Sequence, residues 1–125
     1  MTTPVINYNP GGLQNGCGVA WSALANGAVG VPFLTADFAD ASVQVRGAFG
    51  AGGSVTLQGS NIAEPDLAVA STDWHTLTDP QGNNLTFTGA RLEQIAEGVR
   101  WLRPRVTAGD GATDLEVHLW LRRNR

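Results

Sequence analysis

Short segments along most of this chain alternate between apolar and polar residues. The clearest covers residues 115–122, where four aliphatic residues alternate with four polar or amphipathic ones. The first set is Leu115, Val117, Leu119 and Leu121, and the second is Glu116, His118, Trp120 and Arg122. A period of two is that of a β-strand with one buried face. The pattern therefore predicts an all-β protein.

Turn residues divide the chain into seven or eight such segments. We expect strands at 19–26, 42–49, 54–60, 72–78, 84–88, 101–107 and 115–122, and a short edge strand near 30–34 that contains Pro32. The glycine-rich segment 50–53 predicts a hairpin that pairs 42–49 with 54–60. Residues 91–99 fit one turn of helix as well as a short strand and a loop. Short strands at regular spacing predict a sandwich or a barrel.

The same alternation predicts which side chains face the core. In the first strand we expect Val19, Trp21, Ala23 and Ala25 on one side. In the strand at 54–60 we expect Val55 and Leu57 inside, with Thr56 and Gln58 outside.

The N-terminal segment differs in composition from the rest. Residues 1–18 hold two prolines and four glycines with little periodicity, so we expect an extended arm that either stays mobile or is ordered by contact with another surface. Residues 19–125 then form one β-sandwich domain, which at this size can bury its own core.

Charge is small overall but unevenly distributed. The net charge is −3, there is no lysine, and residues 99–125 carry six of the eight arginines, with a local balance of +3. A polarised surface can orient docking onto a partner, but it falls short of the basic face that nucleic acid requires. The apolar stretch at 19–34 is interrupted and too short for a membrane span of about 20 residues. We therefore expect neither nucleic acid nor membrane as a partner.

Few residues suggest chemistry. His75, His118 and the lone Cys17 do not form a recognisable catalytic set. Asp110 and Asp114 flank a glycine-rich turn but supply too few oxygens for a calcium loop. One cysteine excludes an intrachain disulfide. The first ten residues lack a basic start and an apolar run, so we expect no secretion signal. We expect no enzymatic activity, no metal and no cofactor.

The tryptophans are the more informative side chains. Trp101 alternates with arginines, and Trp120 falls on the side opposite the leucines of its strand, beside His118 and Arg122. A tryptophan next to arginine is typical of contact surfaces. Trp120 could also stack on a sugar or cover the core of a second sheet.

Residues 42–123 resemble a known family. The order V-T-L-Q-G-S-N, then D-W-H-T-L-T-D-P-Q-G-N, then V-R-W-L-R-P-R-V-T-A-G-D-G and D-L-E-V-H-L-W-L-R-R is similar to capsid cement or decoration proteins of tailed bacteriophages. These are small jelly-roll proteins encoded beside the major capsid protein, and the discoidin-like, galactose-binding jelly roll shares the same motifs. The chain departs from the family pattern at Ile62–Ser71, an insertion after the Gly-Ser-Asn turn.

The resemblance implies a jelly-roll β-sandwich and a structural role in the virion. It implies a homo-oligomer, a dimer or trimer made in the host cytoplasm, which sits on the capsid exterior and bridges neighbouring major capsid subunits. The alternative is a carbohydrate-binding module of a phage tail or bacterial surface protein, with Trp101 or Trp120 as the stacking platform. Our candidate interface residues are Val5, Ile6, Tyr8, Trp120, Arg122, Arg123 and Arg125.

Overall fold

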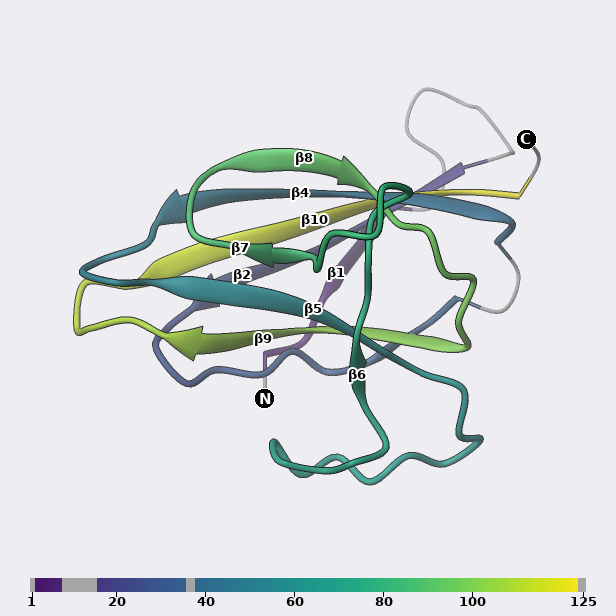
Figure 1. The fold of residues 1–125 in the computed structure, drawn as a ribbon, viewed down its shortest axis with the longest axis horizontal. Helices are drawn as coiled ribbons and strands as arrows, with labels where there is room; N and C mark the ends of the chain where they lie inside the picture. Colours follow the sequence, from purple (N-terminus) through teal and green to yellow (C-terminus); the bar gives the residue numbers. More distant parts are fainter. Residues whose placement is uncertain (1, 8–15, 36–37, 124–125) are drawn as a thin grey trace.

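The described part of the computed structural model, residues 2–7, 16–35 and 38–123, is all β and contains no helix (Figure 1). Its strands are β1 (Val5–Asn7), β2 (Gly16–Leu24), β3 (Phe33–Leu34), β4 (Asp40–Ala48), β5 (Ser54–Ser60), β6 (His75–Thr76), β7 (Thr86–Phe87), β8 (Arg91–Gln94), β9 (Trp101–Ala108) and β10 (Asp114–Arg122). The ambiguous segment 91–99 contains the short strand β8, and the strand expected at 72–78 is reduced to His75–Thr76.

The strands form two antiparallel sheets. One has the order β1-β2-β10-β4-β8; the other has the order β3-β9-β5-β6, with β7 also paired to β5. From β2 to β5 the chain changes sheet at every connection, and it does so again from β7 to β10. The result is a β-sandwich, the class expected from the sequence, in which neighbours along the chain rarely pair with each other.

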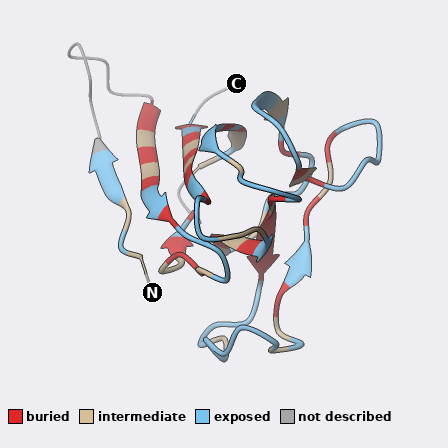
Figure 2. Ribbon diagram, turned by 90° about the vertical axis from the view of Figure 1, so that its left-hand side faces the viewer, coloured by how far each residue is buried: buried red, intermediate tan, exposed pale blue. Residues whose placement is uncertain are grey.

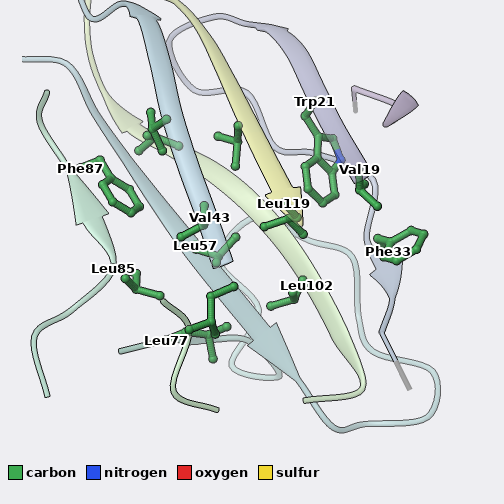
Figure 3. Close-up of a cluster of buried hydrophobic side chains, with 14 of the residues drawn as sticks. Val19, Trp21, Phe33, Val43, Leu57, Leu77, Leu85, Phe87, Leu102 and Leu119 are labelled. Carbon is green, nitrogen blue, oxygen red and sulfur yellow. The ribbon is translucent and has the colours of Figure 1, made fainter. Parts of the chain in front are cut away.

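The core lies between the two sheets and is made of aliphatic and aromatic side chains (Figure 3). Val43 and Leu119 come from one sheet, Leu57 and Leu102 from the other, and each is at most 3% exposed. All four aliphatic residues of β10 are buried, while Glu116 and His118 are half-buried and Trp120 is exposed. The alternation predicted for residues 115–122 is therefore confirmed.

The hairpin predicted between 42–49 and 54–60 is wrong. β4 pairs with β10 and β8, whereas β5 pairs with β9, β6 and β7 in the opposite sheet. The glycine-rich segment is an arch that carries the chain across the core. Gly50 and Gly52 adopt φ values of 71° and 67°, and a Cβ on Gly53 would overlap the carbonyl oxygen of Phe49. These glycines allow the chain to cross from one sheet to the other. The local sequence of such an arch does not differ from that of a hairpin turn.

A second arch, between β9 and β10, packs against the first. The Asp110 carboxylate accepts hydrogen bonds from the backbone amides of Ala51 (2.9 Å) and Ala112 (2.9 Å), which hold the pKa of Asp110 below its usual range. Thr113 Oγ1 donates to the carbonyl of Phe49 at 2.8 Å. Asp110 therefore holds the two arches together through these hydrogen bonds.

A β-bulge changes the inward face of β2. Val117 of β10 lies opposite Trp21, but Leu115 lies opposite Leu24 rather than Ala23. Ala23 has a φ of 54°, and the extra residue shifts the alternation so that Leu24 is buried and Ala23 and Ala25 are exposed. The inward positions expected for Ala23 and Ala25 are wrong for this reason.

The first residues contain an edge strand. β1 pairs with β2 through Val5–Ala20, Ile6–Val19 and Asn7–Gly18, and it is the exposed strand beside the N-terminus in Figure 2. β2 begins at Gly16, so the expected boundary between arm and domain at residues 18 and 19 falls inside a strand. Tyr8 lies outside the described residues.

Candidate functional site

The outer faces of the two sheets differ in how they are covered. On β5, Thr56, Gln58 and Ser60 point away from the core, yet each is at most 7% exposed. We expected Thr56 and Gln58 to face solvent, and this prediction is wrong. Thr56 lies beside Thr86 of β7, with the two hydroxyls 3.0 Å apart. Gln58 is covered by the 61–73 loop, which is the loop at the bottom of Figure 1.

One buried arginine holds that loop in place. Arg103 of β9 is 0% exposed; its Nε donates to Gln58 Oε1 at 2.9 Å, and its Nη atoms donate to the carbonyls of Leu67, Ala68 and Val69 at 3.2–3.4 Å. Burial lowers the pKa of Arg103, and the positive charge of Arg105 lowers it further. The loop carbonyls thus provide much of the solvation that Arg103 has lost.

Trp74 completes the attachment of the loop. The Arg103 guanidinium lies 4.2 Å from the centre of a Trp74 ring, a cation–π contact, and Trp74 Nε1 donates to the Asp66 carbonyl at 2.8 Å. The Asp73 carboxylate accepts from the Asp66 amide at 2.8 Å. The 61–73 loop is therefore an ordered cover for this sheet.

The outer face of the β1-β2-β10-β4-β8 sheet has no such cover among the described residues. Strand register places Gln94, Ser42, Trp120 and Gly18 in one row across β8, β4, β10 and β2, and Leu92, Gln44, His118, Ala20 and Val5 in the next. Leu92 is 63% exposed and Val5 69%. The β2 positions in these two rows are the small residues Gly18 and Ala20. We treat this open face, with the β1 edge, as the candidate functional site.

Two ion-pair groups lie on the open face. Glu116 Oε1 lies 3.1 Å from Arg46 and 2.9 Å from His118 Nε2, and the hydrogen bond with His118 is the main cause of its lowered pKa. Asp40 Oδ2 accepts from Arg122 Nη2 at 2.7 Å, a bond that lowers the pKa of Asp40. Exposed pairs of this kind add little stability, so their effect is to set the charge pattern of the face.

Trp120 borders a depression in the open face. A Cβ on Gly16 would overlap Cζ2 of the Trp120 ring, so the indole lies close against the β2 backbone, and the residue is 37% exposed. The depression beside it has a volume of about 280 Å³. Its lining residues are Asp40, Ala41, Ser42, Gln94, Trp120 and Arg122.

A larger cavity of about 430 Å³ opens between the sheets at the same end of β4 and β10. Its floor includes the core residues Leu102, Ile95 and Leu121, and its rim includes Asp40 and Glu97. Thr78 donates to the Glu97 carboxylate from its amide at 2.9 Å and from its hydroxyl at 2.6 Å; these bonds outweigh the effect of burial and lower the pKa of Glu97.

The structure brings some of the predicted interface residues together. Val5, Trp120 and Arg122 lie on the open face, whereas Ile6 points to the other side of β1 with 39% exposure. Arg123 lies 5.4 Å from the Phe38 ring centre, and Arg125 is outside the described residues. Trp101 is half-buried on the other sheet, and within the described chain its ring nitrogen has no hydrogen-bond partner. Gly16, Ser42 and Gln94 were missed, because only strand register places them beside Trp120.

The remaining titratable side chains are dispersed. His75 lies on β6 and His118 on β10, in different sheets, and Cys17 is buried in β2. Across residues 2–7, 16–35 and 38–123, no three His, Cys, Asp or Glu side chains are grouped so as to hold a metal ion. The same part of the chain has no helix that could cross a membrane.

Comparisons of this chain with protein-family models, with curated proteins and with solved structures find no match. The similarity of residues 42–123 to phage decoration proteins therefore stays a prediction from the motifs. The geometry of the open face and the β1 edge is the evidence that bears on function.

Proposed function

We propose that this chain is a virion structural protein that decorates the capsid of a tailed bacteriophage. It binds the capsid exterior as a homo-oligomer and bridges neighbouring major capsid subunits, after synthesis in the host cytoplasm. The motifs in residues 42–123 support the family, and the strand arrangement supports its fold.

The order of the strands supports the jelly-roll part of this proposal. Numbering β2, β3, β4, β5, β6 with β7, β8, β9 and β10 as strands one to eight gives the sheets 1-8-3-6 and 2-7-4-5. Two Greek keys folded together produce this arrangement, which recurs in capsid proteins. β1 is then an addition to the first sheet, next to its first strand.

The observation that carries the proposal is the chemistry of the β1 edge. Val5 is 69% exposed and Ile6 39%, and Val5–Asn7 contains no charged residue. Proteins normally protect an exposed edge with charge, proline or a covering segment, because its free amides and carbonyls pair readily with another strand. An apolar edge of this kind suits strand addition by a capsid subunit or a sister copy.

The test is binding to shells assembled from the major capsid protein encoded next to this chain. We expect the wild-type protein to cosediment with shells in a fixed ratio to capsid subunits. The double variant Val5→Glu with Ile6→Glu should bind at least about tenfold more weakly, because charged side chains on the edge oppose strand addition. Point variants are preferable to deleting residues 1–12, which would also remove the pairing of β1 with β2.

The control is Ile62→Glu, which places one negative charge on a residue that is 49% exposed in the loop over the other sheet. This variant should bind as wild type. Urea denaturation must first show that all variants are folded. Wild-type binding by the β1 double variant, or absence of binding by the wild-type protein, would overturn the proposal.

A further inference from the structure

The depression beside Trp120 presents an aromatic surface held from below. The indole lies against the backbone at Gly16, where a side chain would displace it. The residue nevertheless stays 37% exposed. Trp120 therefore exposes a fixed apolar surface to solvent and is not part of the core.

The groups around the ring are polar and complementary in hydrogen bonding. Ser42 lies directly across from Trp120 on β4, and Gln94 lies across from Ser42 on β8. Asp40 supplies acceptors, Arg122 supplies donors, and Ser42 and Gln94 supply both. Gln94 Nε2 donates to Asp40 Oδ1 at 3.4 Å. This hydrogen bond links Gln94 to the ion pair of Asp40 with Arg122.

The charges at this site cancel. Asp40 and Arg122 are joined at 2.7 Å, and they are the charged residues in the lining of the depression. A charged ligand would gain little there, because each of its possible partners is already paired. A purely apolar ligand would leave the polar wall without partners. The site fits a neutral molecule with one apolar face and many hydroxyl groups.

We infer that the depression beside Trp120 is a saccharide subsite that takes one neutral pyranose ring. The C–H face of the sugar packs on the indole, and its hydroxyls exchange hydrogen bonds with Asp40, Arg122 and the amide of Gln94. The volume of about 280 Å³ suits a single small ring. This inference goes beyond the decoration role and gives Trp120 and Arg122 a function separate from the shell contact at the β1 edge.

The test begins with an array of neutral and acidic glycans. The best neutral ligand, together with galactose, glucose, mannose and N-acetylglucosamine, is then titrated against the full chain by calorimetry and NMR. We expect saturable binding of at least one neutral glycan, with shifts confined to signals of β4, β8 and β10. Trp120→Ala should weaken it by about tenfold or more, the usual effect of losing a good aromatic contact.

Two further variants separate a binding role from a structural one. Trp120→Phe keeps an aromatic surface and should recover part of the affinity, while Trp101→Ala removes a tryptophan from the other sheet and should leave binding unchanged. Gly16→Ala should weaken binding without touching the polar wall, because it displaces the indole.

Several results would overturn the saccharide site. They are the absence of saturable binding by folded protein to any neutral glycan, preference for acidic glycans, and affinity unchanged by Trp120→Ala. Shell binding is measured on the same variants. The Val5→Glu and Ile6→Glu double variant should keep glycan affinity, and Trp120→Ala should keep shell binding. Loss of shell binding in Trp120→Ala would assign Trp120 to the capsid contact and overturn the saccharide site alone.

Discussion

Replacing Arg103 by methionine tests how the 61–73 loop is held. Methionine keeps much of the apolar stem but removes the guanidinium. The change leaves Gln58 Oε1 without its donor at 2.9 Å and removes the contact 4.2 Å over Trp74. It also frees the carbonyls of residues 67–69, which lie at 3.2–3.4 Å from the Nη atoms.

Two opposing effects set the magnitude. Losing a hydrogen bond from a charged donor to a buried acceptor costs about 1.5–3 kcal/mol, and a partly desolvated cation–π contact adds about 1 kcal/mol. The loop carbonyls recover most of their loss by turning to water. Removing a buried charge also relieves its desolvation cost, which offsets part of the total. We expect the free energy of unfolding of Arg103→Met to fall by about 2 kcal/mol.

Urea denaturation and hydrogen exchange measure this change. With a slope of about 1–3 kcal/mol per molar urea for a chain of this size, the midpoint should fall by roughly 1 M. Amide exchange in residues 66–73 should accelerate more than exchange in β10. The control is Arg105→Ala on the same strand, which removes a repulsive charge from beside Arg103 and should leave stability unchanged or slightly raised.

The reasoning fails if Arg103→Met is as stable as wild type and the loop amides remain equally protected. That outcome would mean that the loop is held by its own internal hydrogen bonds. Destabilisation by Arg105→Ala equal to that of Arg103→Met would also contradict it, because a general loss of positive charge would then explain both.

Three further predictions concern stability and reactivity. Gly53→Ala should lower the melting temperature markedly because its Cβ would overlap the Phe49 carbonyl, whereas Gly98→Ala, in open space, should change it little. The Cys17 thiol, whose pKa is raised by burial, should react with a disulfide reagent only as fast as the protein unfolds. The pKa of Asp79 is lowered, chiefly by the backbone amide of Asn83, so this carboxylate stabilises the fold above about pH 4 and the contribution is lost as pH falls further. Asp79→Asn should therefore show a shallower loss of urea resistance between pH 5 and pH 3.

Each of these predictions has a clear contrary result. Equal melting temperatures for the two glycine variants would show that the first arch relaxes without cost. Rapid reaction of the Cys17 thiol in native protein would show that the beginning of β2 opens readily. An acid profile of Asp79→Asn that matches wild type would place the acid sensitivity in other carboxylates.

Sequence reasoning was most reliable where one strand decides the outcome. In β10 the alternation predicted all four buried aliphatic residues and the outward direction of Trp120, because side-chain direction in a regular strand depends only on position. It failed at Ala23, where a bulge adds one residue opposite β10. A bulge is a property of two paired strands, and neither strand alone reveals it.

The local pattern could not predict which strands pair, or which outward-facing side chains are covered by a loop, for the same reason. The segment 50–53 has the composition of a hairpin turn, yet it crosses between sheets because β4 gains its partners from residues 91–94 and 114–122. The local pattern predicts Gln58 to be a surface residue, yet Arg103 and the 61–73 loop bury it. The position of Gly16 under Trp120 depends on β2 and β10 being neighbours.

The amino-acid sequence by itself determined that this protein is all β, a sandwich or a barrel, since a period of two and frequent turns are encoded residue by residue. The tertiary structure alone decided that β1 is an exposed apolar edge, that an arginine on β9 anchors the 61–73 loop, and that Trp120 borders a neutral polar depression. These features join residues that are distant in the chain. They follow from which strands pair, and pairing is set by the whole core at once.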